Sequence, residues 1–174
     1  MTFKSARFGD ILSEPVRNGI YKKKEFHGQG AKIVNMGEIF AHPRLRAIDM
    51  RRVVINEKEK ARATLQEGDL LFARRSLVAE GAGKCSIVMN VDEATTFESS
   101  IIRARIDAKK HEPLFFYYFF QSPLGRETMR TILRQVAVSG ITGSDLVDLR
   151  VPTPRLHEQR EIAATLGRWM TRSR

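Results

Sequence analysis

The sequence predicts an α+β fold, with a small, twisted and mostly antiparallel sheet followed by C-terminal helices. Short apolar runs bounded by turns occupy the first two thirds of the chain, as expected of short strands. In residues 99–106 apolar side chains alternate with Arg103 and Arg105, which indicates a strand that buries one face and exposes the arginines. From Pro113 onward the segments are of helical length. The 174 residues suffice for one domain with a core plus an appendage.

The predicted strands lie in the first 106 residues. The chain opens with a turn at residues 8–12 into a short helix, for which Asp10 is the expected cap. Residues 17–30 carry three glycines among Lys and Arg, and we expect a loop with a short strand there. The Gly68-Asp69 turn introduces a buried strand that runs into Arg74. Further strands are expected at residues 31–35, 52–55, 70–73, 85–89 and 99–106.

The predicted helices follow Pro113. Residues 114–121 form the first, and Pro123 suits the first turn of a second that runs to about Arg134. Residues 117–120 are four adjacent aromatics, which cannot all face one side of a helix, so they are expected in the core and not on a base-stacking surface. A polar loop at residues 139–144 and a strand at residues 149–151 precede a last helix, which starts near residue 155.

The chain is strongly basic. Thirty Lys and Arg against twenty Asp and Glu give a formal net charge of +10, which favours a polyanionic partner because each phosphate contact releases counterions. A merely basic protein is the alternative. Nucleic acid is the leading partner class because the basic residues gather at expected loops and short strands, in residues 17–24, 44–52, 74–75, 103–110 and 126–134.

The expected cellular location follows from three features that the sequence lacks: a disulfide framework, a membrane helix and a signal peptide. Cys85 is the single cysteine, so neither a disulfide framework nor a cysteine zinc site is expected. No apolar run approaches the length of about 18 residues that a membrane helix needs, and the first residues do not resemble a signal peptide. A cytoplasmic location is therefore expected.

Catalytic patterns fail one by one. Residues 81–84, Gly-Ala-Gly-Lys, lack the first glycine of a phosphate-binding loop, and Cys85 stands where a hydroxyl would hold magnesium. The four histidines show no metal-ligand spacing. Residues 107–109, Asp-Ala-Lys, fit a solvated turn better than a nuclease centre. Neither a glycine-rich cofactor loop nor an adenine methyltransferase tetrad occurs. The sequence predicts a protein with no catalytic or metal-binding residues.

Three segments together resemble the specificity subunits of type I restriction–modification enzymes. No single segment is specific, but their order and spacing span residues 7 to 169. The segments are Glu67-Gly68-Asp69-Leu70-Leu71-Phe72-Ala73-Arg74, then residues 113–130 with Tyr117-Tyr118-Phe119-Phe120 and Ser122-Pro123-Leu124, then Gly140-Ile141-Thr142-Gly143-Ser144-Asp145-Leu146 with Val151-Pro152-Thr153-Pro154 and Glu158-Gln159-Arg160-Glu161-Ile162.

The resemblance implies a target-recognition domain at residues 1–153 and the start of a coiled-coil spacer helix at residues 154–174. It implies sequence-specific binding of double-stranded DNA at one half of a bipartite site, in a prokaryotic restriction–methylation system. Separate methyltransferase and restriction subunits would be partners, and S-adenosylmethionine, ATP and magnesium are expected only on them. The family carries two such domains and long spacer helices, so this chain is expected to be a fragment, a truncated product or a half-subunit.

Candidate DNA-binding residues follow from position and chemistry. Arg74 and Arg75 directly follow a buried strand, and an arginine fork matches guanine O6 and N7, so this pair is the leading candidate for base reading. A phosphate or carboxylate partner is the alternative. Lys22, Lys23 and Lys24 are expected to clamp phosphate or form a solvated face. Further candidates are Ser139, Thr142 and Ser144, with helix capping at Ser144 as their alternative, and Arg17, Asn35, Arg44 and Ser76.

The last helix carries an apolar seam. Its residues are Leu156, Ala163, Leu166 and Met170, with Ile162 and Trp169 beside them. The seam can pack on its own domain or on a partner helix as a coiled coil, as a homodimer or with a second half-subunit.

Two other functions stay open. The first alternative is a recognition domain detached from a fused type II methyltransferase–nuclease. The chain could also be a free-standing nucleic-acid-binding protein without enzyme partners.

Overall fold

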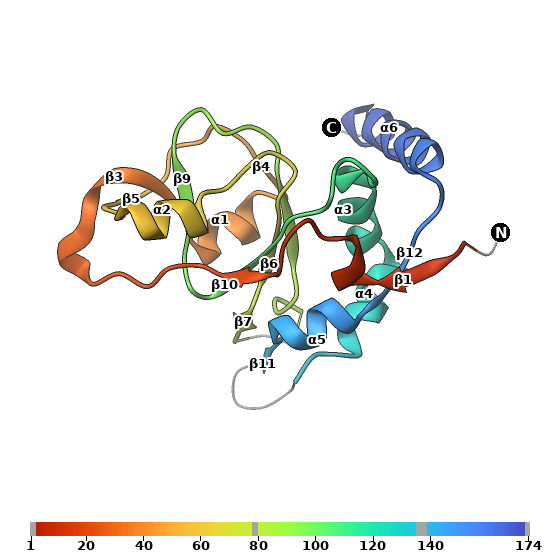
Figure 1. Ribbon diagram of the computed structural model, residues 1–174, viewed down its shortest axis with the longest axis horizontal. Coiled ribbons are helices and arrows are strands. Elements are labelled where there is room, and N and C mark those ends of the chain that lie inside the picture. The colour runs from red at the N-terminus through yellow and green to blue at the C-terminus, as the bar shows by residue number, and fades with distance from the viewer. Residues whose placement is uncertain (1–2, 78–79, 135–138, 173–174) are drawn as a thin grey trace.

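A five-stranded sheet crosses the middle of the molecule (Figure 1). The computed structural model describes residues 3–77, 80–134 and 139–172. Three of the four strand pairs are antiparallel, and β4 runs parallel to β8. The predicted α+β class with a mostly antiparallel sheet is therefore confirmed. In spatial order the strands are β2 (Arg17–Asn18), β10 (Ile101–Ala104), β6 (Leu70–Ala73), β8 (Cys85–Val88) and β4 (Arg44–Leu45).

Both faces of this sheet are buried. Phe72 and Ile102 face a first core under α3 (Pro113–Gln121), while Leu71 and Ile101 face a second core. Burial on both sides explains why β6 and β8 are short continuous apolar runs without alternation. The six residues that follow Leu114 on α3 are all buried, so the predicted core position of its aromatics is confirmed. Phe120 meets Phe72 edge to face with ring centroids 5.0 Å apart.

The second core is closed by a three-stranded sheet and two short helices (Figure 1, left). β3 (His27–Val34) lies between β5 (Arg52–Val53) and β9 (Thr95–Phe97). The β3–β5 register shifts between His27 and Ala31, where Gly28 and Gly30 both have positive φ. The helices are α1 (Met36–Ala41) and α2 (Glu57–Ala63).

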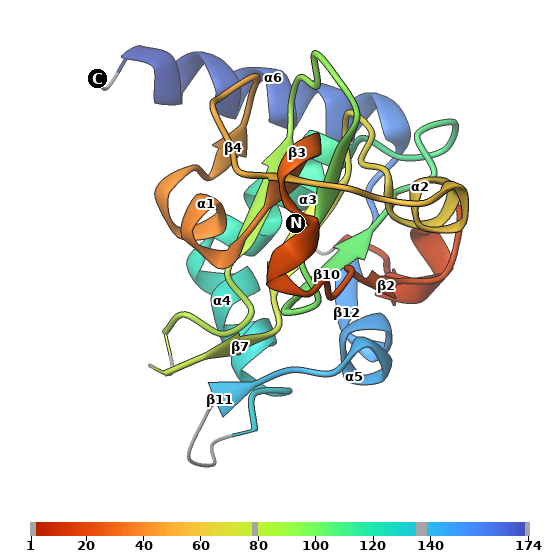
Figure 2. The same cartoon turned by 90° about the vertical axis from the view of Figure 1, so that its left-hand side faces the viewer.

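The C-terminal third forms the other side of the molecule. α6 (Leu156–Arg172) lies over α3, and Figure 2 shows it running across the top. β12 (Arg150–Pro152) pairs with β1 (Ser5–Arg7), which ties the two ends of the domain together. At the opposite end β7 (Arg75–Ser76) pairs with β11 (Ser139–Gly140), close to α4 (Pro123–Arg130) and α5 (Gly143–Asp148) in Figure 2.

Several predicted elements need correction. The first helix is a 3-10 turn, η1 (Phe8–Ile11), whose cap position is Arg7, so Asp10 lies inside it and is not its cap. The loop with a short strand predicted at residues 17–30 contains the short strand β2, but its second half forms another 3-10 turn, η2 (Lys24–Phe26), and the start of β3. Helices α1, α2 and α5 and strand β9 were not predicted. The helix predicted to reach Arg134 ends at Arg130.

No helix in the described ranges has both the length and the apolar content to cross a membrane.

Candidate nucleic-acid interface

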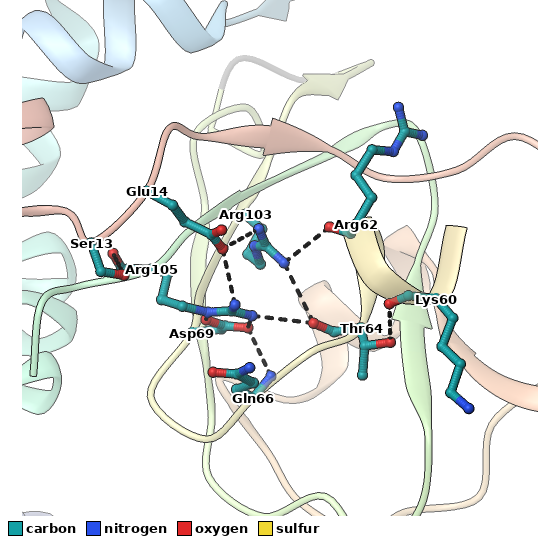
Figure 3. Close-up of polar contacts among 9 residues, drawn as sticks. All are labelled: Ser13, Glu14, Lys60, Arg62, Thr64, Gln66, Asp69, Arg103 and Arg105. Atoms are coloured by element: carbon teal, nitrogen blue, oxygen red, sulfur yellow. Dashed lines mark hydrogen bonds and ion pairs between the residues drawn. The ribbon is translucent and has the colours of Figure 1, made fainter. Parts of the chain in front are cut away.

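The two arginines of the predicted half-exposed strand are not on the surface. The side chain of Arg103 is only 2% exposed, which corrects the predicted alternation. Its guanidinium binds the Glu14 carboxylate and donates to the backbone oxygens of Arg62 and Thr64 (Figure 3). Two separate segments, Glu14 and residues 62–64, therefore supply acceptors for one buried cation, as burial of a charge requires, although its Nε has no partner among the described residues. Burial lowers the pKa of the Arg103 guanidinium.

Arg105 completes this buried network. Its Nε and Nη2 donate to the two Asp69 oxygens at 2.7 and 2.8 Å, and its Nη1 lies 2.9 Å from Glu14 Oε1 (Figure 3). Asp69 also accepts from the Gln66 amide at 2.8 Å, so it fixes the turn before β6. The hydrogen bond to Asp69 raises the pKa of Arg105. These two cations hold the fold together and are not available to a ligand.

In contrast to Arg103 and Arg105, which are paired inside the fold, several of the predicted DNA-binding residues come together where β7 meets β11. We call residues 74–76 and 139–144 together the β7–β11 edge. Ser139 pairs with Ser76 and Gly140 with Arg75, so two predicted segments more than 60 residues apart become neighbours. A Cβ on Gly140 would lie 3.1 Å from the Arg74 oxygen, so glycine permits the close approach.

The two predicted base-reading arginines have different environments. Arg74 is half-buried, and its Nη1 donates to the Ser99 oxygen at 3.3 Å. Arg75 is exposed, and its side chain makes no hydrogen bond or ion pair with any residue that the structure describes. Of the two, Arg75 is the guanidinium left open to a ligand.

The polar residues that follow β11 act mainly within the domain. Thr142 caps α5 by accepting from the Asp145 amide at 3.1 Å, so the cap is Thr142 and not Ser144. Ser144 is exposed, with its hydroxyl 3.0 Å from that of Thr142, whereas Ser139 is buried. Asp145 also pairs with Arg134 at 2.8 Å, and its hydrogen bond with Thr142 lowers the pKa of the carboxyl.

A second open cationic region lies at the β3–β5 end, on the left in Figure 1. We call it the cationic hollow; it encloses about 720 Å³ and is lined by Lys22, Lys24, His27, Gly28, Met50, Arg51 and Arg52. Two of its cations are neutralised: Lys22 pairs with Glu59 at 2.7 Å, and Arg52 grips Glu93 with two bonds of 2.7 and 2.8 Å. Lys24 and Arg51 have no such partner among the described residues.

The other members of the predicted basic segments are dispersed. Lys23 and Arg17 are exposed, Arg17 on the edge strand β2. Arg51 and His27 were not singled out from the sequence, although Arg51 lies in one of the basic clusters. His27 lies three residues after Lys24 in the chain, whereas only the pairing of β3 with β5 brings Arg51 beside them, and no local pattern reveals that pairing.

Two further residues that the sequence predicts to contact DNA, Asn35 and Arg44, make their side-chain contacts within the domain. The Asn35 side chain donates to the Ile33 oxygen at 3.2 Å, at the start of α1. Arg44 lies over the Tyr118 ring, 5.5 Å from its centroid, and donates to the Tyr118 hydroxyl. It also contacts the sulfur of Met170, so it links β4 to α3 and α6.

The apolar seam of α6 faces its own domain over most of its length. Ala163 is buried, and Ile162 and Leu166 pack against the first core. Leu156 is half-buried. Near the end of the helix, Trp169 is 69% and Met170 is 40% exposed.

The described residues contain no group of three or more His, Cys, Asp or Glu side chains that could hold a metal ion.

The fold and these surfaces define a class: an α+β domain that pairs its buried cations internally and presents unpaired cations at two separate ends, as polyanion-binding proteins do. The chain belongs to the family described as type I restriction modification DNA specificity domain, which matches residues 2–171.

Relatives of known name agree with this assignment. The chain is 32% identical over 162 residues to the EcoKI specificity subunit of Escherichia coli K12, which covers 92% of this chain and 34% of that protein. It is 28% identical over 160 residues to the putative MjaX specificity subunit of Methanocaldococcus jannaschii, covering 91% of this chain and 37% of that one. The chain thus spans about a third of the length of these relatives.

Solved structures share the fold. A chain from a type I R-M system, described for its complex assembly and conformational transition, matches with a TM-score of 0.73. The HsdS subunit from Thermoanaerobacter tengcongensis matches with a TM-score of 0.63. Each is 17% identical, and each match covers 98% of this chain with 38% and 43% of the other chain.

Proposed function

We propose that this domain recognises one half-site of double-stranded DNA and directs separate methyltransferase and restriction subunits to it. The observation that carries the proposal is the unpaired Arg75 on the β7–β11 edge of a domain whose family is defined by DNA specificity. The backbone of Arg75 is paired with Gly140 two residues beyond the buried strand β6, and the planar fork of an arginine matches a guanine edge. Ser144, exposed on the same edge, can add a hydrogen bond to a base or phosphate.

The cationic hollow supplies a different contact in this proposal. Lys24 and Arg51 neutralise phosphates of the DNA backbone, while Lys22 and Arg52 keep the hollow in shape through their carboxylate partners. Lysine is a flexible point charge, which suits positioning on any sequence better than base reading. Base reading and backbone gripping are thus assigned to the two ends of the domain.

The domain itself performs no chemistry in this proposal. S-adenosylmethionine, ATP and magnesium bind the partner subunits, and the role on genomic DNA places the assembly in the cytoplasm. Residues 154–174 begin a spacer helix that packs with a second helix near its exposed end, where Trp169 is 69% and Met170 is 40% exposed. Residues 173–174 of that segment lie outside the described residues.

Equilibrium binding at several salt concentrations tests the proposal. A duplex DNA of mixed sequence should bind, and the affinity should fall steeply as salt rises because counterions are released. Duplex RNA of the same sequence should compete poorly, since its deep, narrow major groove hides the base edges. Binding that prefers RNA would favour the free-standing RNA-binding alternative, and affinity that does not change with salt would mean that the basic surfaces are not the binding surface.

A second experiment addresses the partners. The domain should co-purify with a methyltransferase subunit encoded next to it, and methyl transfer should require both proteins. Methyl transfer, ATP hydrolysis or DNA cleavage by the rigorously purified domain alone would contradict its non-catalytic role.

A further inference from the structure

A small cavity lies between α4 and the segment that leads into β8. It encloses about 200 Å³ and is lined by Glu80, Ala82, Gly83, Lys84, Cys85, Phe120, Gln121, Arg126, Met129, Arg130 and Leu133. No contact of the β7–β11 edge or of the cationic hollow uses these side chains. The cavity is therefore a separate feature that the proposed function leaves unexplained.

The floor of the cavity is apolar. Ala82, Cys85, Phe120 and Met129 are all at least 95% buried and present carbon and sulfur. Burial raises the pKa of the Cys85 thiol, so the sulfur stays neutral and behaves as an apolar group. A protein cavity of about 150 Å³ with an apolar lining can hold a benzene ring, so this floor has room for one flat heterocycle.

The rim carries two unpaired cations. Arg126 and Arg130 lie one helical turn apart on α4, and both are exposed. Neither side chain has a hydrogen bond or ion pair with a residue that the structure describes. Like charges at this spacing repel, and no described carboxylate forms an ion pair with either guanidinium group, in contrast to Arg103 and Arg105. An anion held between the two guanidinium groups would remove the repulsion.

The other polar side chains of the lining are Lys84, whose ammonium group donates to the Phe40 oxygen at 3.1 Å, and two side chains that can accept hydrogen bonds. The Gln121 amide donates to the Cys85 oxygen at 2.7 Å, which fixes the side chain and leaves its carbonyl oxygen as an acceptor. Glu80 adds a carboxylate on the lining. These acceptors suit an exocyclic amino group, which adenine and cytosine carry and thymine lacks.

We propose that this cavity binds one nucleotide, with its base on the apolar floor, its amino group toward Gln121 or Glu80, and its phosphate between Arg126 and Arg130. The nucleotide could come from either of two sources. One is an unpaired nucleotide of the DNA, a source that rests on the proposed function; the other is a free mononucleotide, which does not. Taking a base out of the stack costs least where it is already unpaired.

Titration of the whole chain with dAMP tests the free-nucleotide source. The wild type should bind dAMP more tightly than dTMP or inorganic phosphate. The double variant Arg126→Gln/Arg130→Gln should lose at least tenfold in affinity. Lys109→Gln/Arg160→Gln is the matched control, because it removes two exposed cations, one from a loop and one from α6, whose side chains form no hydrogen bond or ion pair with a described residue. It should bind dAMP as the wild type does.

A duplex with one unpaired adenine tests the other source. The wild type should prefer it at least fivefold over the fully paired duplex, and the Arg126→Gln/Arg130→Gln variant should lose that preference. Either a dAMP site or a preference for the unpaired adenine, lost in this variant and kept in the control, supports the cavity. Absence of both, or equal losses in variant and control, overturns it.

The two proposals fail separately. If paired duplex DNA does not bind but dAMP does, the proposed function fails and the nucleotide site stands. If dAMP does not bind, and paired DNA binds and weakens in the arginine variant to the same extent as the duplex with the unpaired adenine, Arg126 and Arg130 are ordinary backbone contacts and the nucleotide site is wrong. Both arginines are exposed, so the variant should fold; circular dichroism checks this.

Discussion

The arginines of β10 and the arginine of β7 lie in neighbouring parts of one molecule but have opposite surroundings. Arg103 and the adjoining Arg105 reach Glu14 and Asp69, and Arg103 is almost completely buried. Arg75 is exposed and has no partner among the described residues. The comparison teaches that a net charge of +10 does not locate a binding surface. The placement of the carboxylates separates cations that hold the fold from cations that are free for a ligand.

The same division recurs inside the cationic hollow. Lys22 and Arg52 have carboxylate partners, and Lys24 and Arg51 have none. Each region thus offers paired and unpaired cations for direct comparison by mutation.

The largest expected effect is on stability, at Asp69. Asp69→Ala leaves the Arg105 guanidinium without its bidentate partner next to the buried Arg103, and should lower the free energy of unfolding by about 3 kcal/mol. Urea unfolding measures the change. Asp148→Ala is the matched control: it breaks an exposed pair with Arg7 and should cost less than about 1 kcal/mol. Equal losses in the two variants would remove the distinction between buried and surface pairs.

On α6, too, substitution of a residue packed on the core should lower the free energy of unfolding more than substitution of an exposed residue. Leu166→Glu places a carboxylate against the first core, and we expect a loss of about 2 kcal/mol in the free energy of unfolding. Glu161→Ala, five residues earlier on the same helix, changes an exposed side chain and should stay within about 0.5 kcal/mol. Thermal unfolding of both variants measures this. A stable, folded Leu166→Glu protein would mean that the seam does not pack on its own domain in solution.

Charge removal in the cationic hollow should change DNA binding without changing stability. Lys24→Gln/Arg51→Gln should flatten the slope of log K against log salt by about 1.8, since each lost phosphate contact contributes about 0.9. The loss in affinity should be similar for all DNA sequences. Lys22→Gln/Arg52→Gln removes the same charge from paired cations and should change the slope less. If both double variants flatten the slope equally, pairing does not decide which cations meet DNA.

The smallest expected effect is a pH dependence at Glu93. The hydrogen bond from Arg52 holds the pKa of this carboxyl at about 2, below its ordinary value of 4.5. A depressed carboxyl pKa contributes stability above pH 4.5, and that contribution is lost as pH falls from about 4.5 to about 2. Glu93→Gln should therefore be less stable than the wild type at pH 6, with the difference shrinking over this window. Unfolding midpoints at a series of pH values measure it; a difference that does not depend on pH contradicts the assignment.

Continuous apolar runs and aromatic clusters made part of this fold predictable. Residues 70–73 were predictable as a buried strand because both faces of β6 are covered, which leaves a continuous apolar run. The aromatics of α3 were predictable as core residues because four adjacent aromatics cannot all lie on one exposed face. The short helices α1 and α2 were missed because six or seven residues carry little periodicity, although Asn56 and Glu59 form a capping box three residues apart.

The site was predictable only where sequence neighbours stay neighbours in space. Arg75 was identified because it directly follows a buried strand. Arg103 was misplaced because its partner Glu14 lies 89 residues away, and strand alternation alone cannot reveal a distant carboxylate. The cationic hollow depends on the pairing of β3 with β5 for the same reason.

Selection of binding sites from a random duplex library tests the central claim most directly, that Arg75 reads bases. The wild type should enrich a short defined half-site. Arg75→Ala should enrich the same half-site with one G·C position relaxed, since a good arginine–guanine pair discriminates by about 1–3 kcal/mol. Lys109→Ala, which removes an exposed cation elsewhere, should enrich the wild-type half-site unchanged. If Arg75→Ala also enriches the unchanged half-site, base reading by the unpaired arginine of the β7–β11 edge is wrong.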